Sequence, residues 1–305
     1  MTEFFDKLSG ISKEIIEKDV LLSHKTTYRI GGPCDVGAFP ETLEQFEAIL
    51  LFCVEENIPF YVMGRGSNLL VDDEGFRGAV IFTERMNNVK FEEGRVLAMA
   101  GAGLTSLSRQ SGALGLAGLE FACGIPGSVG GGVVMNAGAY GGEISDIFES
   151  CTIYRKGVGI LHCSHSDADF SYRHTSFLEN HDYILETSFK LCEDSPEQIR
   201  AREEELLLRR REKQPLEYPS AGSAFKRPEG YFAAKLIEDA GLKGFRIGGA
   251  EVSEKHSGFF VNVGGATSDD VVRLYSEVRA RVEKVFGVTL ESEVRYLSPN
   301  GERVI

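Results

Sequence analysis

The most informative stretch of this chain is GIPGSVGGGVVMNAGAYGG, residues 124–142. It holds eight glycines in nineteen residues and no charged side chain. Because glycine loses much backbone entropy on folding and adds no side chain to a core, we expect a loop here rather than a packed helix or strand. Such a loop brings bare N–H groups close to a bulky anion such as a pyrophosphate. A sharp corner with bulges is the alternative, but it needs fewer glycines, so the composition favours a cofactor loop.

A second glycine-containing turn, MGRGSNLLV at 63–71, directly follows a strand-like run. Its glycines would let the turn close on phosphate, with Ser67 and Asn68 supplying hydrogen bonds. A plain tight turn between strands is the alternative. The spacing is neither GxGxxG before a helix nor a P-loop with its Lys-Ser/Thr pair. This turn alone therefore leaves open both interpretations, a phosphate-binding turn and a plain tight turn. Two such segments in one chain predict a large phosphate-bearing cofactor.

The charge and cysteine content limit the partners and the compartment. The 305 residues carry 33 Lys and Arg against 46 Asp and Glu, a net charge of −13. This balance disfavours nucleic acid and anionic membrane as main partners, but not a phosphorylated substrate in a locally basic pocket. Six scattered cysteines without a CxxC pair predict free thiols in a reducing compartment. Because 1–10 lacks a signal-peptide pattern and no apolar run approaches a membrane span, we expect a cytoplasmic protein.

The first eighty residues predict a β–α–β opening. Residues 42–57 have the spacing of an amphipathic helix, with Thr42 and Gln45 forming a capping box at its start. The apolar face of this helix is expected to comprise Leu43, Phe46, Leu50 and Val54. A buried strand over 60–63 then leads into the second glycine turn.

Short strands dominate 79–191, with one helix expected over 104–114. Residues 196–211 are charged and strongly helical in propensity. We expect them to form a linker helix that begins after Ser195 and exposes its charges to solvent.

The last hundred residues mix helices and strands in a way that predicts a separate domain. We expect a short helix from 235, a strand over 258–263, a long amphipathic helix over 268–286 and a strand over 294–297. Gly287 suits the C-terminal cap of the long helix. The apolar stripe of that helix is expected to comprise Val271, Leu274, Tyr275, Val278, Val282 and Val285.

Three further motifs carry polar groups suited to a site. In SYRHTSF, 171–177, Arg173 would hold a carboxylate or phosphate in bidentate fashion. In AGSAFKRPEG, 221–230, Ser223 would deliver a proton if charged neighbours lowered the cost of its alkoxide. The alternative for Arg173 is an ordinary surface arginine, and the alternative for the segment around Ser223 is a simple polar loop. The local sequence by itself favours the alternative in each case.

The third of these motifs is LESEVRYL, 290–297, where Glu291, Glu293 and Arg295 alternate along an expected strand and so share one face. This pattern predicts either an ion pair in solvent or an acid and an anchor inside a pocket.

A metal site is not expected. His162 and His165 flank Cys163, but no second cluster exists to complete four ligands.

Taken together, MGRGSNLLV, GLEFACGIPGSVGGGVVMNAGAYGGEI, SYRHTSF, AGSAFKRP and LESEVRYL, in this order and spacing, resemble the UDP-N-acetylenolpyruvoylglucosamine reductase family. The resemblance covers nearly the whole chain, from residue 26 to residue 297. It implies an α+β fold of the vanillyl-alcohol-oxidase (PCMH) type, in which two FAD-binding subdomains are followed by a C-terminal α+β substrate-binding domain. We expect these three domains over 1–80, 81–200 and 201–305.

The resemblance also implies an activity. NADPH gives a hydride to FAD, and the enolpyruvyl UDP-sugar then takes the hydride at its vinyl CH2 carbon, forming UDP-N-acetylmuramate for cell-wall peptidoglycan. Arg173 and Glu293 match the family residues that stabilise charge on the neighbouring carboxylate, and Ser223 matches the donor that protonates the adjacent carbon.

Binding residues follow from the same resemblance. Tyr172, Lys226 and Arg295 are expected to contact the substrate. Both glycine segments are expected to wrap the FAD pyrophosphate through Gly64, Arg65, Gly66, Ser67, Asn68, Gly124, Gly127, Ser128, Gly130, Gly131, Asn136 and Gly138.

The chain departs from the family pattern at Arg227, where Asn is common. With no obvious insertion in its last third, it is similar to the shorter form of the family, which lacks an extra tyrosine-bearing loop. Two other functions stay open: an oxygen-using oxidase on the same flavin fold, and a non-catalytic nucleotide-binding module. Such oxidases often tether the flavin through a histidine or cysteine, and only Cys123 lies near a glycine segment.

Overall fold

The structure is a computed structural model that describes residues 8, 10 and 13–305. Apart from residues 8 and 10, the segment 1–10, on which the expectation of no signal peptide rests, lies outside the described residues. Within the described part, no helix is long and apolar enough to cross a membrane.

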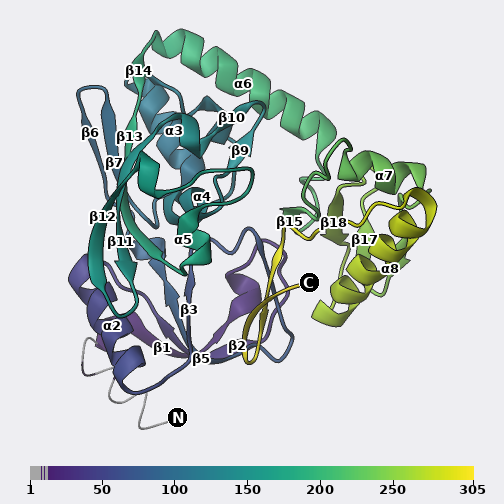
Figure 1. The fold of residues 1–305 in the computed structure, drawn as a ribbon, viewed down its shortest axis with the longest axis horizontal. Helices are drawn as coiled ribbons and strands as arrows, with labels where there is room; N and C mark the ends of the chain where they lie inside the picture. Colours follow the sequence, from purple (N-terminus) through teal and green to yellow (C-terminus); the bar gives the residue numbers. More distant parts are fainter. Residues whose placement is uncertain (1–7, 9, 11–12) are drawn as a thin grey trace.

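The first sheet has four strands in the order β1-β2-β5-β3. They are β1 (Ile16–Leu21), β2 (Pro33–Ala38), β5 (Phe76–Phe82) and β3 (Phe60–Met63). β5 runs parallel to both β2 and β3, while β1 is antiparallel to β2. The connection between β2 and β3 is the helix α2 (Leu43–Glu55), which lies against the sheet in Figure 1. The predicted β–α–β opening is confirmed.

The start of α2 is capped almost as the sequence predicts. Thr42 accepts a hydrogen bond from the Gln45 amide, but the Gln45 side chain accepts from the amide of Glu41 rather than Thr42. The predicted face is also shifted by a few residues, because Leu43 and Val54 are only partly buried. The fully buried positions of α2 are Phe46, Ile49, Leu50 and Cys53.

The second sheet has five antiparallel strands in the order β12-β11-β13-β7-β6. They are β12 (Gly159–Ser164), β11 (Phe148–Arg155), β13 (Tyr183–Lys190), β7 (Arg95–Met99) and β6 (Val89–Glu92). Three helices accompany this sheet: α3 (Leu104–Ala113), α4 (Val129–Val134) and α5 (Ser176–Glu179). Two short ladders complete the region, β9 (Gly138–Ala139) with β10 (Gly142–Glu143), and β8 (Leu116–Ala117) with β14 (Cys192–Glu193).

The expectation that 124–142 contains no helix is wrong, because α4 forms inside it. Ser128 caps α4 by accepting a hydrogen bond from the Gly131 amide at 3.3 Å. The glycines let α4 lie directly on its neighbours. A Cβ at Gly130 would be 2.9 Å from the Ala100 Cβ, and one at Gly132 would be 2.9 Å from a Leu104 methyl group. Close packing therefore outweighs the low helix propensity of glycine.

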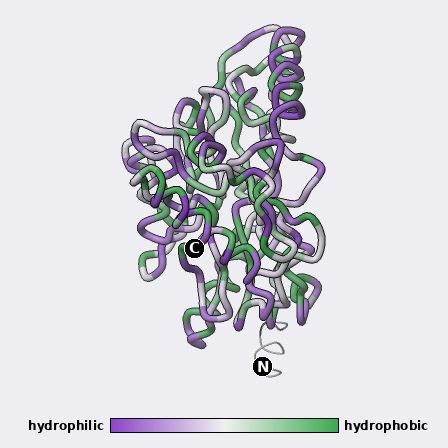
Figure 2. The backbone as a smooth tube through the Cα atoms, turned by 90° about the vertical axis from the view of Figure 1, so that its right-hand side faces the viewer, coloured by the Kyte–Doolittle hydropathy of each residue, from purple (hydrophilic) through white to green (hydrophobic). Residues whose placement is uncertain are grey.

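The helix α6 (Pro196–Lys213) runs from the second sheet across to a smaller body (Figure 1). It begins after the N-cap Ser195, as predicted. Hydrophilic residues dominate this helix at the top of Figure 2, although two of its residues, Ile199 and Glu203, are buried.

The smaller body contains a four-stranded sheet in the order β15-β18-β17-β16. Its elements are β15 (Ser220–Ser223), α7 (Ala233–Asp239), β16 (Arg246–Ile247), β17 (Ala250–Val252), β18 (Phe259–Asn262) and α8 (Ser268–Phe286). The predicted bounds of α8 and its left-handed cap at Gly287 (φ 67°) are confirmed. One member of the predicted apolar stripe is wrong: Val285 is 59% exposed, whereas the next residue, Phe286, packs against the core.

The end of the chain returns to the region where it began. Strands β19 (Arg295–Ser298) and β20 (Gly301–Val304) form a hairpin, and β19 pairs in parallel with β4 (Leu69–Val71). In Figure 1 this yellow hairpin lies beside the blue and purple strands. The boundary expected at residue 80 falls inside β5, so the three-domain division stays a prediction.

Gly130→Ala is expected to lower the free energy of unfolding by about 1–3 kcal/mol, because the Ala100 backbone belongs to a packed segment and cannot give way. Gly131→Ala is the matched control on the same helix, since its Cβ would meet only the Ser128 hydroxyl at 3.3 Å. That change should be neutral or stabilise α4 by up to about 1 kcal/mol. Urea unfolding of the flavin-free variants measures both, and equal effects would contradict the packing role of Gly130.

Candidate active site

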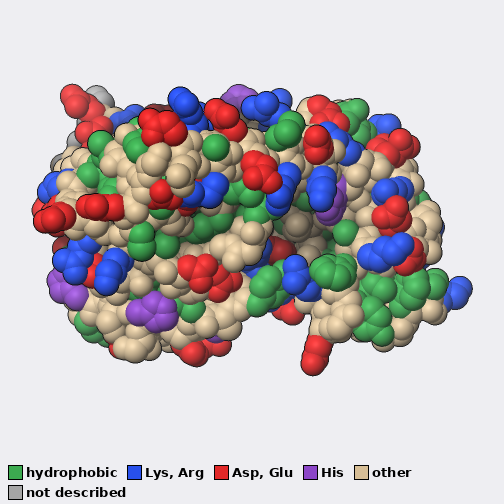
Figure 3. All heavy atoms as spheres, turned by 90° about the horizontal axis from the view of Figure 1, so that it is seen from above, with side chains coloured by type: hydrophobic (Ala, Val, Ile, Leu, Met, Phe, Trp, Pro, Cys, Tyr) green, Lys and Arg blue, Asp and Glu red, His purple; other side chains and the backbone are tan. Residues whose placement is uncertain are grey.

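A cavity of about 1020 Å³ lies where the two sheets of the larger body meet the smaller body. Its lining comes from the turn after β3, from the glycine-rich stretch, from the turn that carries Arg173, from β15 and from the segment before β19. Figure 3 shows the surface hollowed between the two bodies, with Lys and Arg side chains along the rim. Five motifs far apart in sequence thus contribute to one cavity.

The two glycine segments touch each other across one side of this cavity. A Cβ at Gly64 would lie 2.3 Å from the Ser128 hydroxyl, so only glycine allows this contact. Gly66 has φ +57°, and a Cβ there would lie 2.3 Å from the carbonyl oxygen of Lys25. The result is a wall of bare backbone facing the cavity, which suits close approach of a bulky ligand.

Most of the residues predicted to bind the cofactor line this cavity. They are Gly64, Arg65, Gly66, Ser67, Asn68, Gly127, Ser128, Gly130, Gly131 and Gly138. Gly124 and Asn136 are not in the lining. Gly124 lies against the side chain of Arg210. Asn136 is buried and donates to Glu143 (3.0 Å) and to the Ser171 carbonyl (3.1 Å), so its side chain shapes the surrounding loops.

Arg173 and Glu293 form an ion pair in the cavity wall. The Arg173 Nε donates to Glu293 Oε1 at 2.7 Å, and both side chains are less than one-fifth exposed. A second guanidinium nitrogen donates to the Gly138 carbonyl at 2.9 Å, which fixes the plane of the group. Arg173 lies in a tight turn between Ser171 and His174 and has φ +57°, a conformation that few non-glycine residues adopt. The surrounding bonds hold it there despite the strain.

Backbone pairing places Ser223 next to Glu293. The Glu293 amide donates to the Ala224 carbonyl at 2.9 Å, and the Asn68 side chain donates to the Glu293 carbonyl at 3.1 Å. Ser223 ends β15 and exposes its hydroxyl to the cavity. Ser223, Arg173 and Glu293 therefore line one cavity, and their catalytic roles stay a prediction.

Glu293 binds its proton more tightly than an ordinary glutamate. Burial raises the pKa of this carboxyl, while the Arg173 charge and hydrogen bond lower it, with burial the larger effect. When it is protonated, this carboxyl can donate a hydrogen bond to developing negative charge.

The predicted substrate residues are less tightly gathered. Tyr172 is 47% exposed and its ring lies 5.0 Å from the Arg173 guanidinium, outside the cavity lining. Lys226 also lies outside the lining and pairs with Glu291 at 2.6 Å. Arg295 does line the cavity, but it pairs with Glu302.

Glu291, Glu293 and Arg295 alternate with the buried residues Ser292, Val294 and Tyr296, as the predicted sharing of one face requires. Regular pairing begins only at Arg295, and the three side chains have three separate partners. Residues 291–293 pair instead with the segment after β15.

Two cavity residues, Arg210 and Gln214, were missed because α6 was expected to expose its charges. That expectation is right for Arg209, but wrong for Glu203 and Arg210. The sequence contains a pattern that indicates this face of α6. Its members recur every three or four residues: Ile199, Glu203, Leu207, Arg210 and Gln214.

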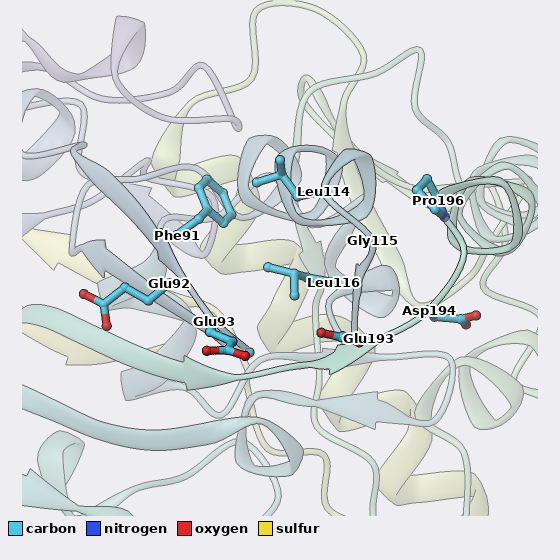
Figure 4. A pocket seen from close by; sticks show the side chains of 10 residues that line it. Phe91, Glu92, Glu93, Leu114, Gly115, Leu116, Glu193, Asp194 and Pro196 are labelled. Atoms are coloured by element: carbon cyan, nitrogen blue, oxygen red, sulfur yellow. The ribbon is translucent and has the colours of Figure 1, made fainter.

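A second cavity, of about 460 Å³, lies near the end of α3. Figure 4 shows its lining of Leu116, Glu93 and Glu193 among others. None of the predicted site residues contributes to it.

The histidines near Cys163 take part in local hydrogen bonds. His162 bonds with Thr152 at 3.0 Å, and His165 with the Ser145 carbonyl at 3.2 Å. In the described residues no group of three or more His, Cys, Asp and Glu is arranged to hold a metal ion. All six cysteines are free thiols.

Comparison with known proteins decides the family. Residues 214–297 match the model of the UDP-N-acetylenolpyruvoylglucosamine reductase C-terminal domain, and residues 34–164 match an FAD binding domain. A UDP-N-acetylenolpyruvoylglucosamine reductase from Clostridium botulinum is 47% identical over 96% of this chain and 95% of its own length. The chain belongs to the UDP-N-acetylenolpyruvoylglucosamine reductase family. It is an FAD-binding oxidoreductase.

Solved structures confirm the predicted fold class. The UDP-N-acetylenolpyruvylglucosamine reductase of Thermus caldophilus matches with a TM-score of 0.79 and 34% identity, over 92% of this chain and 98% of that one. Phl p 4.0202, a glucose dehydrogenase, matches with a TM-score of 0.50 and 13% identity over 64% of this chain and 44% of that one, which shows the fold alone. The chain has the α+β, PCMH-type FAD-binding fold with a C-terminal domain of the reductase family.

The cavity fits FAD. Glycines of both segments line it, so main chain without side chains can approach a pyrophosphate closely. The Ser67 and Asn68 side chains line the same region.

Arg173→Gln is expected to raise the pKa of Glu293 further, because Arg173 is the main group favouring the ionised carboxylate. Because the pKa of Glu293 is higher in the folded than in the unfolded protein, binding of a proton stabilises the folded state. This stabilisation is complete at pH values below the unfolded-state pKa of glutamate. This stability is lost as the pH rises through the folded-state pKa. In Arg173→Gln this loss of stability should therefore extend to higher pH than in the wild type, because the folded-state pKa of Glu293 is higher. Carboxyl 13C NMR titration, with urea unfolding at each pH, measures this.

Glu293→Gln is the control, and it should remove this component of the pH dependence. An unchanged or lower pKa of Glu293 in Arg173→Gln would show that the two groups are not coupled.

Proposed function

We propose that this protein reduces UDP-N-acetylenolpyruvoylglucosamine to UDP-N-acetylmuramate with NADPH, as a step in peptidoglycan precursor synthesis in the cytoplasm. The observation that carries the proposal is the meeting of Ser223 with the Arg173–Glu293 pair in one glycine-walled cavity. Membership of the reductase family, with a relative 47% identical over nearly the full chain, supports the same reaction.

FAD, when bound, supplies the redox chemistry by accepting hydride from NADPH and passing it to the vinyl CH2 carbon of the substrate. The glycine segments would hold its pyrophosphate through backbone N–H groups and Ser67, Asn68 and Ser128. We assign Gly124 and Asn136 an indirect part, because one makes room for Arg210 and the other bonds the loops around Arg173.

Arg173 and Glu293 would stabilise the substrate carboxylate as hydride arrives and negative charge spreads into it. Arg173 supplies fixed positive charge, with its guanidinium already oriented by the Gly138 carbonyl. Glu293, whose pKa burial raises, supplies a hydrogen-bond donor when protonated. Preorganised groups of this kind lower the barrier because they need no rearrangement during the reaction.

Ser223 would then give its hydroxyl proton to the carbon adjacent to the one that received hydride. The hydroxyl is exposed to the cavity at the end of β15 and lies beside Glu293 through the pairing of their backbones. The nearby Arg173 lowers the cost of the transient alkoxide.

Because this chain is similar to the shorter form of the family, its substrate would be held by side chains such as Tyr172, Lys226 and Arg295. Tyr172 lies at the rim, with its hydroxyl accepting from the Arg227 amide at 3.4 Å. Lys226 and Arg295 would have to exchange their carboxylate partners for substrate oxygens. We also propose that the three-part division at 80 and 200 describes the domains, with the C-terminal hairpin joined to the first.

Ser223→Ala is expected to leave reduction of the flavin by NADPH unchanged and to slow its reoxidation by the enolpyruvyl sugar about 100-fold or more, the usual share of a general acid. Stopped-flow absorbance of the two half-reactions measures each rate separately. Ser220→Ala, on the same strand and in the same cavity wall, is the control and should change neither rate greatly. Equal slowing of both half-reactions by Ser223→Ala would contradict the proton-donor role.

The purified protein is expected to be yellow and to release all of its FAD on acid precipitation. Cys123 directly precedes the glycine-rich stretch, and burial raises the pKa of its thiol to about 11, so it is protonated and unreactive at neutral pH. Absorbance of the supernatant measures the released flavin. Colour retained in the pellet would instead favour an oxidase with tethered flavin, and colourless protein that refuses added FAD would exclude the proposed reaction.

A further inference from the structure

One edge strand of the second sheet, β12, carries nothing that would prevent another strand from pairing with it. Within the described residues the two large sheets end in the edge strands β1, β3, β6 and β12. β1 carries Glu17 and Asp19, β6 carries Lys90 and Glu92, and β3 borders the large cavity. β12, with the sequence GILHCS, has no charged residue and lies outside the cavity lining. Because proteins usually block exposed edges with charges, bulges or covering segments, we expect this edge to be covered by a further strand.

The outer side of β12 is regular and partly apolar. Among the described strands β12 pairs with β11 alone, in unbroken register, so no bulge turns its outer N–H and C=O groups away. Val158, in the turn before the strand, is 63% exposed, and Ile160 is 43% exposed. The His162 side chain bonds with Thr152 at 3.0 Å and so lies over the neighbouring strand. The outer backbone groups of β12 are therefore accessible.

The two ends of β12 carry opposite charges. Lys156 precedes the strand, Asp167 and Asp169 follow it, and all three are exposed and without an ion-pair partner in the part of the chain that the structure describes. Hydrogen bonds from the Ser164 side chain and amide hold the pKa of Asp167 below its usual range, so this carboxylate is charged at neutral pH. In an antiparallel pair of two such strands, the positive end of each lies at the negative end of the other. The strand is thus complementary to a second copy of itself.

We propose that β12 is the interface of a homodimer, in which it pairs antiparallel with β12 of a second copy about a two-fold axis at the middle of the strand. The two five-stranded sheets then form one continuous sheet across the axis. Main-chain hydrogen bonds supply most of the affinity, and Val158 and Ile160 pack against side chains of the facing strand. The contact is isologous, so it closes on itself at two copies. It leaves the active site open, because none of 156–169 lines the large cavity.

Sedimentation velocity of the FAD-loaded protein tests the dimer. A single added strand makes a small interface, so we expect a dissociation constant on the order of 10 µM. The weight-average mass should rise from near one chain toward two as the concentration increases from about tenfold below to about tenfold above this value. The backbone amides of 160–164 should exchange with deuterium more slowly at the highest concentration than at the lowest.

Ile160→Lys adds a charge from each copy at the join and should raise the dissociation constant about tenfold or more. Leu114→Lys is the matched control, because Leu114 is 58% exposed at the end of α3, in the wall of the second cavity and away from this edge. That change should leave the dissociation constant as in the wild type. Bound FAD, measured by absorbance, checks that each variant is folded.

A charge exchange tests the antiparallel arrangement, and it decides the matter if Ile160→Lys does not fold. Lys156→Asp and Asp169→Lys should each raise the dissociation constant about threefold at low salt, the size expected for an exposed ion pair. The double variant should recover most of this loss, because opposite charges then meet again at each end of the strand pair.

Wild-type protein that sediments as one chain at the highest concentration would overturn the proposal. So would a dimer whose dissociation constant responds neither to Ile160→Lys nor to the charge changes, because its interface would then lie elsewhere. The proposed reductase reaction is independent of both results, since β12 contributes nothing to the lining of the large cavity.

Discussion

The ion pair between Arg173 and Glu293 joins residues 120 positions apart in the sequence, and the arrangement of the active site depends on it. Its two partners come from a tight turn beside the second sheet and from the segment that leads into the C-terminal hairpin. A largely buried charge is costly unless it is paired and hydrogen-bonded. Each partner therefore fixes the other, and neither loop can move without exposing an unpaired charge to a poorly solvated wall.

Backbone geometry supports this pair from both sides. Arg173 keeps its unusual φ of +57° because the turn bonds between Ser171 and His174 and the Gly138 carbonyl hold it in place. Glu293 is held through its main chain by Asn68 and Ala224, which leaves its carboxyl free to face the guanidinium. In this way the glycine turn at 63–71, expected to hold only cofactor, also positions Glu293.

The glycines of the two cavity segments act mainly by allowing close contact. Gly64 allows the turn to reach Ser128, and Gly130 and Gly132 allow α4 to lie on Ala100 and Leu104. The same absence of side chains leaves the cavity wall bare for a pyrophosphate. Packing and ligand binding thus impose the same requirement on the same stretch, which explains why it is so rich in glycine.

The sequence by itself determined α2 and α8, because helical spacing of apolar residues is a local property, and it determined α6 through helix propensity and its N-cap, which are local as well. It also determined the family, because five ordered motifs survive as short local patterns. Only the tertiary structure decided which polar groups meet. It paired Arg295 with Glu302 and Glu291 with Lys226, buried Glu203, and placed Arg210 and Gln214 in the cavity wall. The physical reason is that an ion pair or a cavity wall joins residues from distant segments, and local spacing holds no information about which segments will lie together.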